Sequence, residues 1–133
     1  MNTPDFRLIP EALAMAGQVL QQQCHGAAQH WWKDIRTGAD IRDNPMAFDQ
    51  KLCLIHSEIS EAMEGNRKDL MDDKLPHRKM REVELADAVI RIFDTAGGFG
   101  MDLAGAIVEK MQYNAHRADH KTENRLAEGG KAY

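Results

Sequence analysis

Hydrophobic residues recur along most of this chain at intervals of three and four, the spacing of one face of an α-helix. No segment shows the sustained apolar–polar alternation that predicts a half-buried β-strand. Around residues 45–66, the apolar row is expected to face the core, and it consists of Phe48, Leu52, Ile55, Ile59 and Met63. The pattern therefore predicts an all-α protein.

Prolines and glycines mark the ends of the predicted helices. Pro10, Pro45 and Pro76 stand where helices begin, because a first helical turn tolerates proline. The run Gly97-Gly98-Phe99-Gly100 predicts a break, after which Asp102 can cap the next helix. We expect one domain with a polar tail after about residue 120 and with helices at about residues 10–33, 45–66, 77–97 and 102–117.

Composition narrows the possible functions. The 133 residues are 43% hydrophobic, as in ordinary globular proteins, and no apolar run approaches the roughly 20 residues that span a bilayer. The N-terminus lacks the features of a secretion signal, and Cys24 and Cys53 are expected to be buried free thiols in a reducing compartment. The net charge of −4, with no long basic tract, argues against binding to nucleic-acid polymers. We expect a cytoplasmic protein that does not bind membranes.

Two pairs of carboxylates interrupt apolar helix faces. Glu58 falls inside the apolar arc of the second helix, and Glu61 is its neighbour three residues on. Glu84 and Asp87 lie in a third helix whose segment VELADAVIRIF is apolar on nearly every side, as in buried helices. Unpaired buried carboxylates cost several kcal/mol each, so a cation is expected to balance these four.

Two explanations compete for this pattern. The acids could form a solvated face with internal salt bridges, and Arg91, on the same stripe as Asp94, could neutralise part of their charge. Two pairs set into apolar faces of successive helices favour a metal site instead. Carboxylates without Cys or His suit Mg²⁺ or Mn²⁺ rather than Zn²⁺, and Mg²⁺ usually keeps positions for water and substrate phosphate. We therefore expect a phosphate-bearing ligand.

The fourth helix carries Lys110, Asn114 and Arg117 at intervals of four and three, on the row begun by inward-facing apolar residues. Lysine and arginine there could hold the non-bridging oxygens of a polyphosphate. A solvated helix end, where cations suit the helix dipole, explains the same spacing equally well.

Together these motifs resemble the MazG-like, all-α nucleoside triphosphate pyrophosphohydrolases, whose signature is E-x-x-E, a spacer and E-x-x-D. Here the signature is matched by Glu58-Ile-Ser-Glu61, 22 intervening residues and Glu84-Leu-Ala-Asp87. The family's last core helix often carries K-x-x-x-N-x-x-R, which Lys110 to Arg117 match. The resemblance spans about residues 52–120. Ser57 stands where some members have a further Glu, which leaves the number of metal ions open.

The resemblance implies a four-helix bundle, assembled into homodimers or homotetramers, that hydrolyses an NTP or dNTP to the monophosphate and pyrophosphate. It implies a Mg²⁺ or Mn²⁺ cofactor. Glu61 is also the candidate for the base that takes a proton from the attacking water. The residues it implies are the metal ligands Glu58, Glu61, Glu84 and Asp87 and the phosphate contacts Lys110, Asn114 and Arg117.

The segment His30-Trp31-Trp32 ends the first helix and supplies candidates for binding the nucleobase, because indoles stack on bases. Neighbouring helical residues differ by about 100° in direction, so one tryptophan is expected to face the nucleotide and the other to pack. Likeness to small phage-type relatives favours a guanine nucleotide such as dGTP. The alternatives are a dUTPase-like or dCTPase-like pyrimidine enzyme with the same metal chemistry, and a non-catalytic helical interaction module.

Overall fold

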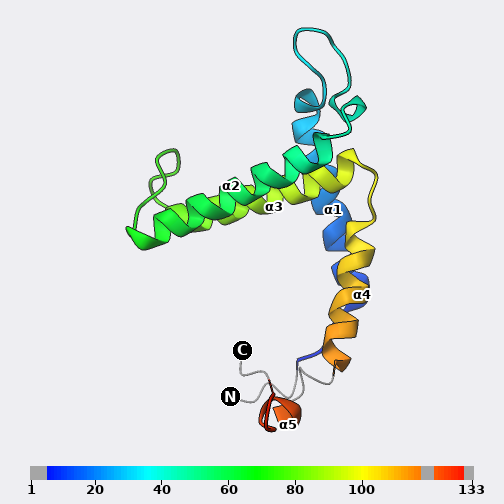
Figure 1. The fold of residues 1–133 in the computed structure, drawn as a ribbon, viewed down its shortest axis with the longest axis vertical. Coiled ribbons are helices and arrows are strands. Elements are labelled where there is room, and N and C mark those ends of the chain that lie inside the picture. The colour runs from blue at the N-terminus through cyan, green and yellow to red at the C-terminus, as the bar shows by residue number, and fades with distance from the viewer. Residues whose placement is uncertain (1–5, 118–121, 131–133) are drawn as a thin grey trace. The chain divides into compact units, whose positions relative to one another are not determined.

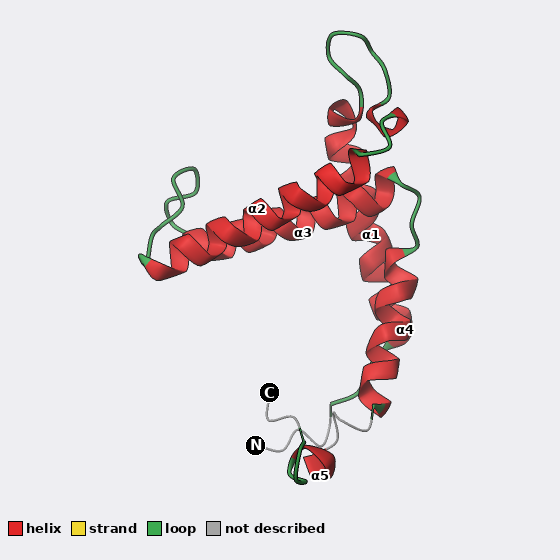
Figure 2. Cartoon of the chain, viewed as in Figure 1, coloured by secondary structure: helices red, strands yellow, loops and turns green. Residues whose placement is uncertain are grey.

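The computed structural model describes residues 6–117 and 122–130, and these form helices and loops without a β-strand (Figures 1 and 2). The all-α prediction is confirmed, and each of the four predicted helices is present. The first one ends sooner than expected and continues as a 3₁₀ turn, η1. The elements are α1 (Pro10–Ala28), η1 (Gln29–Trp32), η2 (Ile41–Asp43), α2 (Ala47–Arg67), α3 (Met80–Gly98), α4 (Leu103–His116) and the short α5 (Thr122–Arg125).

The chain divides into two compact units. Unit 1 consists of Met1–Gln18 with Asp102–Tyr133, and unit 2 of Val19–Met101. The single-domain expectation stays a prediction, and part of the predicted polar tail lies outside the described residues. Within the described ranges, no helix combines the length and apolar character needed to cross a membrane.

In unit 2, α2 and α3 run antiparallel, side by side (Figure 1). Small residues allow this close approach: Ala62 and Gly65 on α2 and Ala88 on α3 are all buried. A Cβ added to Gly65 would lie 2.7 Å from Cγ of Met80. The two helices therefore meet along a narrow seam of small side chains, and the same seam contains the acidic residues described below.

Only part of the apolar row of α2 packs as its periodicity predicts: Phe48 and Ile55 are half-buried, but the other three members are exposed. Leu52, Ile59 and Met63 are 39%, 47% and 61% exposed, because α2 turns Glu58 and Ala62 toward α3 instead. Cys53, expected to be buried, is also exposed.

The exposed apolar row of α2 continues on α3, and antiparallel pairing places both rows on one side of the hairpin. At about 100° per residue, each row lies roughly a third of a turn from Glu58 or Glu84 and roughly opposite Glu61 or Asp87. Unit 2 thus has an acidic side and an apolar side. We call the latter the apolar face, and it consists of Leu52, Ile59, Met63, Leu85, Val89 and Ile92.

Trp32, the last residue of η1, packs against the end of α3. It is 2% exposed, and its ring packs edge-on against Phe99 at 5.4 Å between centroids. A Cβ added to Gly98 would lie 2.1 Å from Cη2 of this indole. Gly97 and Gly98 are the last residues of α3, so the helix ends within the predicted break, and the chain turns at Gly100, whose φ is +66°.

In unit 1, the first half of α1 crosses α4 where Gly17 meets Ala104. A Cβ on Gly17 would lie 2.7 Å from the Cβ of Ala104, so this crossing also depends on small residues. Asp102 caps α4 as predicted, with its Oδ1 accepting a hydrogen bond of 3.0 Å from the backbone N–H of Gly105.

Candidate metal centre and adjoining pocket

Three carboxylates meet in the seam between α2 and α3. Glu58 comes from α2, and Glu84 and Asp87 from α3. One oxygen of each lies within 4.8 Å of the others. Glu58 and Glu84 are buried and Asp87 is half-buried. The structure thus brings together three of the four predicted metal ligands at a spacing that one ion can bridge.

Among the three carboxylates, Glu84 has a buried oxygen without a hydrogen-bond partner in the described residues. This oxygen is Oε2, and the residue is 9% exposed. Burial, then the carboxylates of Glu58 and Glu61, raise the pKa of Glu84 to about 8. A buried carboxylate oxygen among other acidic side chains is a suitable ligand for a hard divalent cation such as Mg²⁺ or Mn²⁺.

The neighbouring acids respond to the same surroundings. Burial, then the charge of Glu58, raises the pKa of Asp87. At Glu58, burial acts to raise the pKa, but hydrogen bonding with Glu84 and with Arg91 lowers it overall. Glu61 is exposed on α2, close enough to influence both glutamates. Its roles as a ligand and as the base stay predictions.

Arg91 neutralises part of this charge, as the salt-bridge alternative anticipates. Its Nε donates a 2.9 Å hydrogen bond to Oε1 of Glu58. One guanidinium faces three clustered carboxylates, so the arginine alone does not balance them. The ion pair and a bound divalent cation are therefore compatible.

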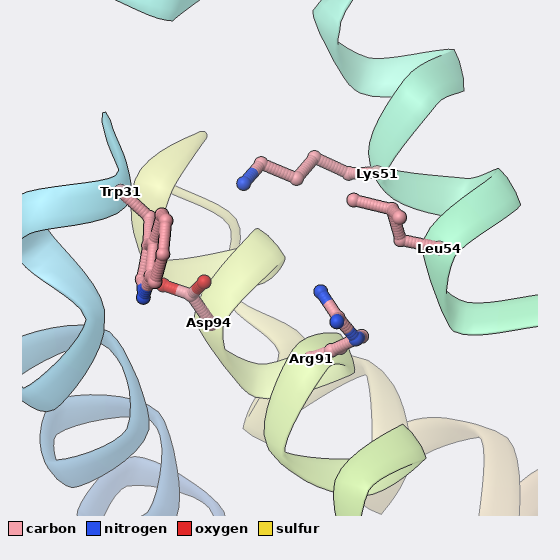
Figure 3. A pocket seen from close by; sticks show the side chains of 5 residues that line it. All are labelled: Trp31, Lys51, Leu54, Arg91 and Asp94. Atoms are coloured by element: carbon pink, nitrogen blue, oxygen red, sulfur yellow. The ribbon is translucent and has the colours of Figure 1, made fainter. Parts of the chain in front are cut away.

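Beside the carboxylates lies a pocket of about 370 Å³, within the usual range of small-molecule sites. Arg91 lines this pocket and also contacts Glu58, so the pocket and the acidic cluster adjoin. Figure 3 shows the lining side chains converging from α2, α3 and the end of the first helical segment. They are Trp31, Lys51, Leu54, Arg91 and Asp94.

The two tryptophans take different places. Trp31 is 67% exposed and forms one wall of the pocket, whereas Trp32 is buried. His30 is exposed, with its ring centroid 4.8 Å from that of Trp31, and it does not line the pocket. The assignment of these residues to the base stays a prediction.

Asp94 is held by two neighbours beneath the pocket. Trp32 Nε1 donates to its Oδ1 at 2.8 Å, and Nδ1 of His25 lies 2.9 Å from the same oxygen. Lys51 places its Nζ 4.5 Å from the Trp32 ring centroid, and burial lowers the pKa of this lysine. Sequence patterns assigned no role to Asp94 beyond its place on the acidic stripe, and none to Lys51 or His25.

The predicted phosphate contacts belong to unit 1, not to the unit that holds the carboxylates. Lys110 is exposed rather than inward-facing, with Nζ 4.8 Å from the ring centroid of Tyr113. Asn114 is half-buried, and its Oδ1 has no hydrogen-bond partner among the described residues. Arg117 lies 6.0 Å from the same tyrosine ring. Their role in binding phosphate stays a prediction.

Comparison with protein-family models, with curated proteins and with solved structures found no match to this chain. The MazG-like resemblance therefore rests on the sequence motifs alone. The function proposed below rests on those motifs and on the geometry of unit 2.

We expect the melting temperature of the metal-free protein to fall as pH rises from about 5 to about 8. The folded state holds a proton on Glu84, whose pKa is about 8, while the unfolded state releases it near the ordinary value of 4.5. The contribution of Glu84 to the free energy of unfolding is therefore fully present below pH 4.5 and is lost as the pH rises through about 8. Mg²⁺ should offset the loss by replacing the proton, so it should stabilise more at pH 8 than at pH 6.

Thermal melts across this pH range, with chelator and with excess Mg²⁺, measure both trends. Glu84→Gln should flatten the pH dependence and weaken the response to Mg²⁺. Equal melting temperatures with and without Mg²⁺ at every pH would contradict the metal centre.

Proposed function

We propose that this chain is a cytoplasmic, metal-dependent pyrophosphohydrolase that cleaves an NTP or dNTP to the monophosphate and pyrophosphate. The observation that carries the proposal is the buried, unpartnered Oε2 of Glu84, in a cluster with Glu58 and Asp87. The ordered E-x-x-E and E-x-x-D motifs add the resemblance to MazG-like enzymes. The four-helix bundle of that family is part of the proposal.

In the proposed reaction, Glu58, Glu84 and Asp87 hold a Mg²⁺ or Mn²⁺ ion, which supplies charge neutralisation and a more acidic water. Glu61, at the exposed edge of the cluster, takes the proton of the attacking water. Arg91 lies between the cluster and the pocket, where its guanidinium can pair with a phosphate oxygen. Lys110, Asn114 and Arg117 are proposed to bind further phosphate oxygens.

The direct test is a panel of NTPs and dNTPs incubated with Mg²⁺, with products separated by ion-exchange chromatography. We expect monophosphate and pyrophosphate, and no turnover with chelator. A nucleoside diphosphate with inorganic phosphate would overturn the proposed bond cleavage. Preference for dUTP or dCTP would support the pyrimidine alternative, and no turnover with any nucleotide would support a non-catalytic helical module.

We also propose that the protein is a homodimer or homotetramer. The apolar face of unit 2 presents six large apolar side chains, each between 38% and 61% exposed. Contiguous exposed apolar surface of this kind usually marks an interaction site. A second copy can cover it with its own apolar face, leaving the acidic side of each hairpin open to substrate.

Leu85→Glu should dissociate this assembly, because it places a charge within the apolar face. Sedimentation velocity should show the wild-type protein as an oligomer and the variant as a smaller species. Ile35→Glu is a matched control at an apolar residue that is 98% exposed outside the hairpin, and it should leave the assembly intact. A monomeric wild-type protein would contradict the proposal.

A further inference from the structure

Asp94 presents an acceptor to the pocket that its own neighbours do not use. The residue is 8% exposed, and both of its hydrogen-bonded neighbours, Trp32 and His25, engage Oδ1. Across residues 6–117 and 122–130, Oδ2 accepts no hydrogen bond. Asp94 and Trp31 both line the pocket, and in Figure 3 one carboxylate oxygen of Asp94 points toward the space bordered by Lys51 and Arg91. The pocket therefore contains a fixed anionic acceptor.

The Asp94 carboxylate determines which chemical groups can bind in the pocket. A phosphate beside Asp94 would meet a like charge in a partly desolvated space, which disfavours it. A neutral group that donates hydrogen bonds satisfies the carboxylate instead. Lys51 adds a donor in the same pocket, and the Trp31 indole adds a flat wall. The complementary ligand is planar and neutral, with donors next to an acceptor, as in a nucleobase.

The five common bases differ in the donors and acceptors that they present to a carboxylate. Guanine has two adjacent donors, N1–H and N2–H, next to the acceptor O6. Adenine and cytosine place an unprotonated ring nitrogen beside their single amino group, and its lone pair would face the carboxylate. In uracil and thymine, the N3–H lies between two carbonyl oxygens, which would repel the carboxylate on both sides. Guanine therefore fits an aspartate–lysine pair best.

We propose that this pocket is the base subsite and that it selects guanine: Asp94 accepts from N1–H and N2–H, Lys51 donates to O6, and Trp31 covers one face of the base. The inference rests on the proposed hydrolysis of nucleoside triphosphates and adds two specificity residues to it. Arg91 lines the pocket and also contacts Glu58, so it connects the proposed base subsite with the carboxylate cluster.

The test compares dGTP with dITP, which lacks only the N2 amino group, and with dATP. In the wild-type protein we expect kcat/KM for dGTP to exceed that for dITP by about tenfold, with a larger margin over dATP. Asp94→Asn should bring the dGTP/dITP ratio close to one by lowering kcat/KM for dGTP more than for dITP, because dITP has only the N1–H to lose as a donor to the carboxylate. Lys51→Met should lower the preference for dGTP over dATP. Asp49→Asn, an exposed acid on α2, is the matched control and should keep the wild-type ratios.

A binding measurement separates this inference from the proposed reaction and needs no variant of Asp94. Deoxyguanosine and deoxyinosine, which carry no phosphate, are titrated into the protein while tryptophan fluorescence is followed. Deoxyguanosine should bind more tightly, and its signal should vanish in Trp31→Phe. Hydrolysis without preference for guanine over hypoxanthine overturns the inference and leaves the proposed function standing. Selective binding of deoxyguanosine without hydrolysis of any nucleotide supports the base subsite and overturns the pyrophosphohydrolase.

Discussion

Glu84→Gln is expected to lower kcat/KM for nucleotide hydrolysis by about 100-fold or more, because it replaces a proposed metal ligand with a neutral amide. The same change should leave the metal-free fold as stable as the wild type or more so. It removes a carboxyl group whose ionisation is unfavourable in the folded state, where burial and the neighbouring acids raise its pKa to about 8. Steady-state kinetics at saturating Mg²⁺ and thermal melts with chelator measure the two effects.

The matched control is Glu82→Gln, two residues earlier on α3. Glu82 is exposed and pairs with Arg78 at the surface, so its loss should change neither turnover nor stability by much. Near-normal turnover in Glu84→Gln would remove this residue from the metal centre. An equal loss of activity in both variants would point to a general charge effect instead.

Gly98→Ala is expected to destabilise the fold by about 1–3 kcal/mol, the usual cost of overpacking a core. The added Cβ would lie 2.1 Å from Cη2 and 2.3 Å from Cζ2 of Trp32. This indole cannot withdraw easily, because it is buried and its Nε1 donates to Asp94. Urea unfolding measures the loss, and tryptophan fluorescence should report a displaced ring.

Gly26→Ala is the control for the glycine substitution itself. Gly26 lies in α1, and apart from its own helix backbone and chain neighbours no atom of the described residues lies within 4 Å of an added Cβ. Alanine there should therefore stabilise by about 0.5–1 kcal/mol through helix propensity. Opposite signs at the two positions would attribute the effect of Gly98→Ala to its contact with Trp32. Unchanged stability in Gly98→Ala would show that the indole is not confined.

The helices could be predicted because their signals are local. Periodicity, Pro10 at the start of α1 and the Asp102 cap all act within a few residues. Pro45 and Pro76 are less exact signals, because α2 begins only at Ala47 and α3 only at Met80. A glycine pair has two physical explanations, a helix break or a close contact, and both apply here because α3 ends at Gly98, one residue after the predicted end. Gly98 is helical because Trp32, far away in sequence, occupies the space of its side chain.

Periodicity identified only part of the buried side of α2. An apolar row shows that one face of a helix avoids water, but it does not show which surface covers that face. Here α3 packs on the row of Glu58 and Ala62, which leaves Leu52 and Ile59 exposed in the single chain. The small residues of the seam, rather than the large apolar ones, determine how the two helices pair.

The carboxylate cluster was accessible from sequence because each pair lies within one helix at a spacing of three. The pocket was not, because its residues come from separate segments. Asp94 meets Trp32 and His25 across 62 and 69 residues of sequence. Contacts between such distant residues leave no local pattern in the sequence. A single lysine such as Lys51 belongs to no motif that would indicate a role.

The seam between α2 and α3 also determines where the chain can change length. One residue inserted between Glu58 and the end of α2, or between the start of α3 and Asp87, would rotate part of the helix by about 100°. That rotation would replace acidic side chains with apolar ones along the contact between α2 and α3. Residues 68–79 lie outside both helices, so insertions and deletions there leave the helical phase unchanged. Length variation within the 22-residue interval between the two acidic motifs should therefore be tolerated in this loop and not in the helices.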